Sequence, residues 1–159
     1  PKLLRKYKII HQSGTIEYYH DYEALTSKVR SLAVGRQRRY RLAKWFNSKE
    51  VAEILKKADL VVSRAGANII SELTFLAKPA VLIPFPFLKE QTMNAGLLVK
   101  AGIAEMLSQE DLNSERLLAL IAMMVKNLKT YRAQDHQLKK LIKVDAVEKI
   151  IAIVKKCGR

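Results

Sequence analysis

The stretch RAGANIISE, from Arg64 to Glu72, combines residue types that together could bind a nucleotide. Gly66 can adopt backbone angles that other residues resist, and it lets a ligand come close to the main chain. Helical spacing begins at Ala67, so the free N–H groups of the first helical turn could bind a diphosphate. At about 100° per residue, Asn68 and Glu72 lie on one side of that helix. A carboxylate there could accept hydrogen bonds from both hydroxyls of a ribose.

Each of these residues also has an ordinary structural interpretation. A glutamate on the open side of a helix is most often a solvated surface residue, and a glycine can simply form a turn. Arg64 could belong to a structural salt bridge. Gln91 and Asn94 lie three apart on the same side of the first turn of another predicted helix, where amides can act as caps. Taken alone, the glycine and the glutamate are weak evidence for a site.

The elements that must position this stretch alternate along the chain. Apolar runs and helical spacing predict strands at residues 7–10, 60–63, 80–84 and 103–107, and helices at 21–33, 48–57, 67–77 and 91–101. Residues 36–45 predict a strand or a loop, and from residue 113 onward the pattern is helical, with two shorter basic helices at the end. This order indicates an α/β, Rossmann-like parallel sheet with helices on both faces.

In such a sheet, ligands bind at the carboxyl ends of the strands, where loops lead into helix N-termini. The junction Ser63–Ala67 lies at such a place. The helix 67–77 is expected to bury one apolar stripe, which consists of Ile69, Ile70, Leu73, Leu76 and Ala77. Glu72 is then held on the open side, about one turn beyond the anion site.

Composition limits the classes of function that fit these 159 residues, of which 49% are hydrophobic. The length suits one globular domain, and no apolar run approaches the ~18 residues of a membrane span. The N-terminus lacks the apolar region of a secretory signal. One cysteine, Cys157, and three separated histidines, His11, His20 and His136, predict neither disulfides nor a metal site. These features favour the cytoplasm.

The net charge of +14 is concentrated on the two flanks of the chain. Residues 1–57 contain 14 Lys and Arg against 5 Asp and Glu, and residues 116–159 contain 11 against 3. Residues 58–115 contain 4 against 7. Basic flanks are attracted to anionic lipid head groups, although they can also be a simple solvated surface. Nucleic acid is disfavoured, because no nucleic-acid-binding motif accompanies the basic run Arg36–Arg41.

Four segments together resemble the MurG family of bacterial glycosyltransferases. They are HQSG at His11–Gly14, ADLVVSRAGANIISE at Ala58–Glu72, KPAVLIPFP at Lys78–Pro86 and EQTMNAGLLVKAGIAEML at Glu90–Leu107. The resemblance covers about residues 1–125 and corresponds to the C-terminal, donor-binding half of a GT-B fold. It implies an inverting hexosyltransferase that moves N-acetylglucosamine from UDP-N-acetylglucosamine to the lipid-linked acceptor lipid I in peptidoglycan synthesis. It also implies no metal and no cofactor.

The resemblance assigns roles to particular residues of this chain. Those implied for the sugar nucleotide are Gly66, Ala67 and Asn68 at the diphosphate, Glu72 at the ribose hydroxyls, and Gln91 and Asn94 at the sugar hydroxyls. Backbone groups of Phe46 and Asn47 would read the uracil edge, and Arg64 would fix its loop. No catalytic residue is implied within these 159 residues.

The sequence departs from the family pattern in three places. Ile69 stands where the family usually has threonine, and the loop Phe87–Glu90 is one residue shorter. The family's glycine-rich loop and its N-terminal domain, which binds the acceptor and holds the catalytic base, are not present. We therefore expect a fragment or subunit that needs an N-terminal acceptor domain or a partner subunit, peripheral to the inner face of the cell membrane.

Two other functions remain open at this point. The catalytic subunit of the dolichol-linked N-acetylglucosaminyltransferase has a similar fold and similar motifs, and it needs a membrane partner. A non-catalytic module that binds a nucleotide or an anionic surface would also fit the basic flanks. In each case we expect a nucleotide-binding domain at residues 1–125 and basic helices at residues 126–159.

Overall fold

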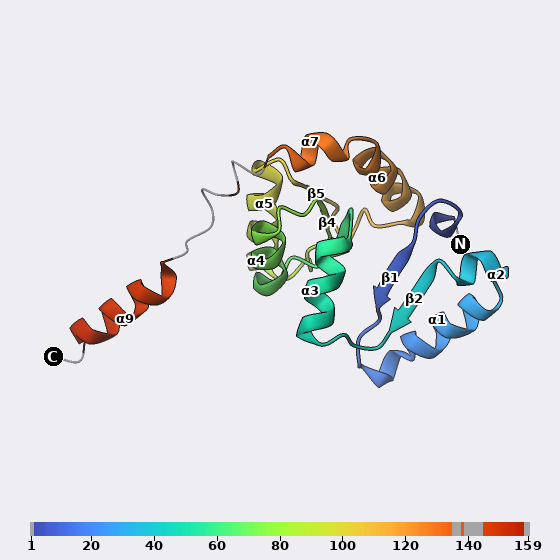
Figure 1. Cartoon of the computed structure of the whole chain (residues 1–159), viewed down its shortest axis with the longest axis horizontal. Coiled ribbons are helices and arrows are strands. Elements are labelled where there is room, and N and C mark those ends of the chain that lie inside the picture. The colour runs from blue at the N-terminus through green and yellow to red at the C-terminus, as the bar shows by residue number, and fades with distance from the viewer. Residues whose placement is uncertain (1, 135–137, 139–144, 158–159) are drawn as a thin grey trace. The chain divides into compact units, whose positions relative to one another are not determined.

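The structure is a computed structural model of the chain, and it describes residues 2–134, 138 and 145–157 (Figure 1). The chain forms two compact units, Pro1–Lys57 and Ala58–Arg159.

The first unit contains a pair of parallel strands with helices between them. Its elements are η1 (Leu3–Arg5), β1 (Ile9–Gln12), η2 (Glu17–Tyr19), α1 (Asp21–Arg30), α2 (Val34–Gln37), β2 (Tyr40–Ala43) and α3 (Ser48–Lys57). Strands β1 and β2 pair in register from Ile9 opposite Tyr40 to Gln12 opposite Ala43. The α3 helix has the predicted bounds, and residues 36–45 contain the end of a short helix as well as the strand.

Two boundaries in this unit differ from the prediction for local reasons. Strand β1 begins two residues late, because the N–H of Tyr7 is held in the preceding turn by the carbonyl of Leu3 (2.9 Å). Helix α1 ends at Arg30 instead of residue 33. There the Nε2 of Gln37 donates to the carbonyls of Arg30 (3.1 Å) and Leu32 (2.7 Å). These carbonyls at the end of the helix thus receive a hydrogen bond from a side chain outside it.

The second unit contains three parallel strands in the order β3-β4-β5. Its elements are β3 (Val61–Ser63), α4 (Ala67–Phe75), β4 (Ala80–Leu82), α5 (Lys89–Lys100), β5 (Ala104–Met106), α6 (Ser114–Lys126), α7 (Leu128–Arg132) and α9 (Ala146–Cys157). The predicted α/β architecture with parallel strands and alternating helices is confirmed. The described strands form two sheets, one in each unit.

The core of the second unit lies on β4 and on the inner sides of α4 and α5. Every residue of β4 is buried, and Leu73, Leu98 and Ile103 are fully enclosed. Apolar burial of this kind contributes about 25 cal/mol per Å². Strand β3 is less buried than β4: Val62 is 44% exposed, and β3 is an edge strand of its sheet.

Helix α4 presents two different sides. Ile70 and Leu73 are buried as predicted, and Asn68 and Glu72 are exposed. Thr74 was not part of the predicted stripe but is also buried, with its hydroxyl donating to the carbonyl of Ile70 (2.6 Å). The helix ends at Phe75, two residues before the predicted end.

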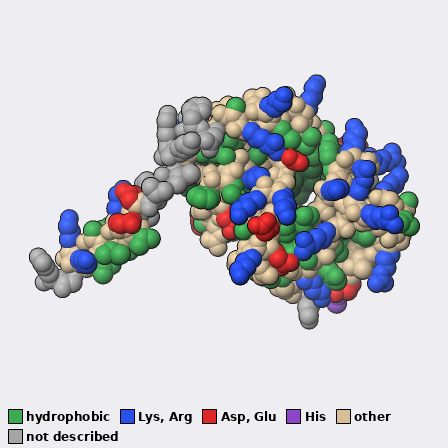
Figure 2. All heavy atoms as spheres, in the orientation of Figure 1, with side chains coloured by type: hydrophobic (Ala, Val, Ile, Leu, Met, Phe, Trp, Pro, Cys, Tyr) green, Lys and Arg blue, Asp and Glu red, His purple; other side chains and the backbone are tan. Residues whose placement is uncertain are grey.

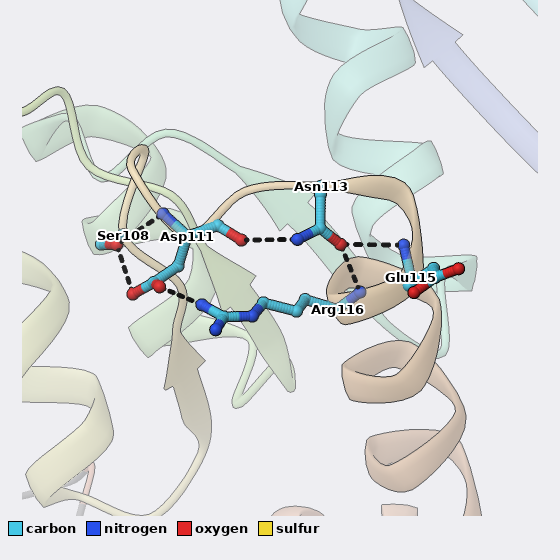
Figure 3. A network of polar contacts seen from close by, with 5 residues as sticks. All are labelled: Ser108, Asp111, Asn113, Glu115 and Arg116. Carbon is cyan, nitrogen blue, oxygen red and sulfur yellow. Dashed lines mark hydrogen bonds and ion pairs between the residues drawn. The ribbon is translucent and has the colours of Figure 1, made fainter.

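A braced turn connects β5 to α6 (Figure 3). The Ser108 hydroxyl donates to an Asp111 carboxylate oxygen (2.7 Å), and the N–H of Asp111 donates back to that hydroxyl (3.0 Å). Asn113 is the N-cap of α6, accepting from the N–H groups of Glu115 (3.1 Å) and Arg116 (2.9 Å). The Arg116 guanidinium also pairs with Asp111. The turn Ser108–Asp111 is thus fixed from both ends.

Among the described residues, no helix has both the length and the apolar character needed to cross a bilayer. Helix α9 is amphipathic, and Figure 2 shows hydrophobic side chains exposed along it beside charged ones. The exposed apolar residues of α9 are Val147, Ile150, Ile151, Ile153 and Val154. Lys139, Lys140 and Lys143, which contribute to the basic C-terminal flank, lie outside the described residues.

Candidate functional site

A cavity of about 390 Å³ lies where β3 ends and α4 begins. Its lining residues are Ser63, Arg64, Gly66, Ala67, Asn68 and Ile69 from this junction and Gln91 from α5. The first N–H groups of a helix have no partner within it. The first N–H bonded along α4 is that of Ile70, which donates to the carbonyl of Gly66 (3.1 Å). The helix therefore presents its N-terminal donors and positive dipole end at the cavity.

Gly66 contributes space and not an unusual backbone conformation. Its φ of −67° and ψ of 155° are open to any residue, so the backbone freedom expected of a glycine is not used here. A Cβ built at Gly66 meets no atom within 4 Å. The missing side chain therefore leaves open space directly beside the N-terminus of α4.

Arg64 joins the ends of all three strands of the second unit. Its Nη1 donates to the carbonyl of Ile83 just after β4 (3.0 Å) and to the Oε1 of Gln109 in the turn after β5 (2.7 Å). Its guanidinium carbon lies 3.9 Å from the centre of the Phe85 ring, a cation–π contact. These contacts connect the loop of Arg64 to the loops that follow β4 and β5. No ion pair of Arg64 is present in the described part of the chain.

Gln91 and Asn94 project from the inner side of α5 and hold two loops. The Oε1 of Gln91 accepts from the N–H of Phe85 (3.1 Å), and the Nδ2 of Asn94 donates to the carbonyl of Ala65 (3.1 Å). Neither amide caps its own helix in this arrangement. Within the described residues, the Nε2 of Gln91 and the Oδ1 of Asn94 have no hydrogen bond and remain available to a ligand.

Glu72 lies one helical turn beyond Asn68 on the exposed side of α4. It does not line the cavity, whereas Asn68 does. Over the described residues it forms neither an ion pair nor a side-chain hydrogen bond. Its carboxylate is thus available to a ligand that extends from the cavity along the outer side of the helix.

Phe46 and Asn47 lie in the first unit, in the loop before α3. The N–H of Phe46 donates to the Oε1 of Gln12 (3.0 Å). Asn47 and Glu50 form a reciprocal cap, in which each side chain accepts from the backbone N–H of the other (both 3.0 Å). The backbone N–H groups of both residues expected at the uracil edge are therefore already bonded in this structure.

Two residues that contribute to these loops were not predicted. Gln12 belongs to the HQSG segment, but nothing in the spacing indicates that its side chain holds Phe46. Gln109 lies 45 residues from Arg64 in the sequence, and no short motif connects the two. Among the described residues, no group of three or more His, Cys, Asp and Glu side chains could hold a metal ion.

Comparisons with known proteins agree with one another. A curated N-acetylglucosaminyltransferase of Bacillus cytotoxicus that acts on N-acetylmuramyl-(pentapeptide) pyrophosphoryl-undecaprenol is 41% identical over 105 residues, which are 65% of this chain and 29% of the relative. The corresponding enzyme of Geobacillus thermodenitrificans is 32% identical over 162 residues, covering 100% of this chain and 41% of the relative. The chain thus spans well under half the length of these relatives.

Solved structures show the same fold. The crystal structure of MurG from Acinetobacter baumannii superposes with a TM-score of 0.74 at 22% identity, over 94% of this chain and 40% of that one. The spinosyn forosaminyltransferase SpnP gives a TM-score of 0.59 at 12% identity, over 96% of this chain and 46% of the SpnP chain. Both are glycosyltransferases, so the fold expected from the resemblance is confirmed. Residues 1–150 match the glycosyltransferase family 28 C-terminal domain, and the chain belongs to that family.

Proposed function

We propose that this chain is the donor-binding half of an enzyme that transfers N-acetylglucosamine from UDP-N-acetylglucosamine to lipid I. The main support is the cavity at the junction of β3 and α4, where helix N–H groups and Gln91 meet an open space beside Gly66. The relatives are named as N-acetylglucosaminyltransferases acting on an undecaprenol-linked acceptor. That acceptor favours the bacterial reaction over the dolichol-linked one.

In this proposal the diphosphate binds at the N-terminus of α4, against the N–H groups of Ala67, Asn68 and Ile69. The ribose hydroxyls donate to the Glu72 carboxylate. The free ends of the Gln91 and Asn94 amides bond to hydroxyls of the sugar. Uracil reading at Phe46 and Asn47 needs the carbonyl groups of this loop, or displacement of Gln12 and Glu50, because both N–H groups are occupied.

The reaction is attack of an acceptor hydroxyl on the anomeric carbon, with UDP as the leaving group. Negative charge grows on the diphosphate as the glycosidic bond breaks, and fixed N–H donors and the helix dipole at α4 stabilise it. The base that takes the proton from the acceptor hydroxyl belongs to the N-terminal half of the enzyme or to a partner subunit. The 159-residue chain should therefore bind the donor without transferring the sugar.

Nucleotide titration tests this function. In calorimetry or NMR titration, the 159-residue chain should bind UDP-N-acetylglucosamine and UDP more tightly than GDP, and weakly, since it spans less than half the length of these relatives. It should form no product with lipid I. Equal binding of UDP and GDP, nanomolar affinity, or sugar transfer by this chain alone would contradict the proposal.

The basic flanks support a further part of the proposal, a position at an anionic membrane surface. We expect the chain to sediment with vesicles that contain anionic lipid, because each basic residue near such a surface contributes roughly 1 kcal/mol. Binding should weaken sharply as salt rises, since the Debye length is ~10 Å at 0.1 M. Cosedimentation that does not depend on salt, or none at all, would count against this position. Neutral vesicles provide the control.

A further inference from the structure

Among the described residues that line the cavity, Arg64 is the one with a cationic side chain. The orientation of its guanidinium therefore decides how positive charge and N–H donors are presented to an anion there. A guanidinium has five N–H donors in a planar fork, and a pair of them on one edge matches the oxygens of a phosphate.

The contacts of Arg64 use one end of this fork. Nη1 has two hydrogens and makes two hydrogen bonds, one to the Ile83 carbonyl (3.0 Å) and one to the Gln109 Oε1 (2.7 Å). The Nε and Nη2 hydrogens have no hydrogen-bond acceptor in the described part of the chain. The edge formed by Nε and Nη2 is thus the one left for a ligand.

Of the groups that hold Arg64, Gln109 is the side-chain acceptor. The Ile83 carbonyl is main chain, and the Phe85 ring contacts the flat side of the guanidinium at 3.9 Å without selecting an edge. Gln109 itself is held in place, because it lies in the turn that Ser108 and Asp111 brace (Figure 3). The N–H of Leu107 also donates to the carbonyl of Leu82 on β4 (2.9 Å), which fixes the chain just before this turn.

We infer that Gln109 is a positioning residue for the diphosphate: its carboxamide occupies Nη1 of Arg64, so that the Nε and Nη2 edge stays available to phosphate oxygens. A carboxamide suits this role because it accepts the hydrogen bond without neutralising the guanidinium. A carboxylate in the same place would hold Arg64 equally well but would cancel its charge. The inference rests on the proposed function, in which the cavity binds a nucleoside diphosphate.

Gln109→Leu and Gln109→Glu separate orientation from charge. In Gln109→Leu one of the two hydrogen bonds of Nη1 is lost, while the bond to the Ile83 carbonyl remains. Affinity for UDP should fall about tenfold, the range expected for a hydrogen bond to a charged group. In Gln109→Glu the bond remains, so thermal stability should be kept while UDP affinity still falls about tenfold. Uridine has no phosphate, and its affinity should change in neither variant. NMR titrations of both ligands measure these ratios even where binding is weak.

The ¹⁵N signals of the Arg64 side chain provide a readout that needs no nucleotide. A guanidinium bonded through Nη1 rotates slowly about its Cζ–Nε bond, so Nη1 and Nη2 give separate signals. They should be well separated in the unmodified chain and in Gln109→Glu, and exchange with each other faster in Gln109→Leu, in which Nη1 keeps only its bond to the Ile83 carbonyl. Gln37→Leu is the matched control, because Gln37 also holds a loop through its side-chain amide, in the first unit. It should lower stability without changing the preference for UDP over uridine.

These measurements can overturn the inference in several ways. Equal loss of UDP and uridine affinity in Gln109→Leu, or full UDP affinity in Gln109→Glu, would show a purely structural role. An unchanged exchange rate between the two Nη signals in Gln109→Leu would show that Gln109 does not orient Arg64. No preference for UDP over uridine in the unmodified chain would count against the proposed function, while the Arg64 signals would still decide whether Gln109 orients the guanidinium.

Discussion

Glu72→Gln is expected to lower the affinity of the chain for UDP about ten- to a hundredfold. The substitution keeps the size of the side chain but removes the charge of the acceptor proposed to bind both ribose hydroxyls. A hydrogen bond to a charged group contributes ~1.5–3 kcal/mol, which corresponds to this range of affinity. Stability should not change, because Glu72 is exposed and has no ion pair or side-chain hydrogen bond within the described residues. NMR titration and thermal unfolding measure the two quantities.

A ligand that lacks one hydroxyl makes this test specific. 2′-Deoxyuridine diphosphate should bind the unmodified chain poorly, and Glu72→Gln should cost it much less affinity than it costs UDP. The four affinities form a double-mutant cycle between the carboxylate and the hydroxyl. Equal weakening of both nucleotides, or of neither, would show that Glu72 is not the ribose acceptor. The stretch RAGANIISE would then be an ordinary strand–turn–helix junction at this position.

Leu73→Ala is expected to lower the free energy of unfolding by about 2–5 kcal/mol, the range for a large apolar side chain truncated in a core. Leu73 is 0% exposed and packs in the buried cluster with Ile70, Leu82 and Leu98. Truncation leaves a cavity that these neighbours fill only in part. Denaturant unfolding followed by circular dichroism measures the change. The neighbouring Glu72→Gln should give no comparable loss, so two adjacent residues of α4 should separate stability from binding.

A matched control is available on the next helix. Leu97 of α5 is 50% exposed, so Leu97→Ala removes the same atoms from a site that is partly in water. It should cost clearly less than Leu73→Ala. Equal losses at the two positions would mean that the inner side of α4 does not form the core of this unit.

Much of the second unit could be predicted from the sequence, because its signals are local. The runs LVVS and AVLIP have no polar alternation, and strands β3 and β4 lie within them. The spacing of Ile70 and Leu73 correctly placed the buried side of α4, and the exposed position of Glu72 followed from the same angles. The glycine before the helix and the open space beside it were likewise predictable from residue type.

The parts that were missed depend on contacts between distant residues. The bond between Arg64 and Gln109 joins loops that only the sheet brings together, so no spacing rule could indicate it. The bond between Gln12 and Phe46 is of the same kind: the Gln12 side chain, at the end of β1, accepts from the N–H of Phe46, which follows β2. The early end of α1 depends on Gln37, a residue beyond the predicted helix. The burial of Thr74 became possible because its hydroxyl finds an acceptor one turn back, in its own helix.

The two amides of α5 have a consequence for the entropy of binding. Gln91 and Asn94 are each anchored at one end by a main-chain partner, so their side-chain torsions are already restricted before any sugar arrives. Ordering a free, rotamer-rich side chain at an interface costs about 0.5–1.5 kcal/mol. When a sugar bonds to the other ends of these amides, the two side chains therefore lose little additional freedom. The conformational entropy of the two side chains is already lost when the chain folds, so the sugar hydroxyls bind to preorganised groups.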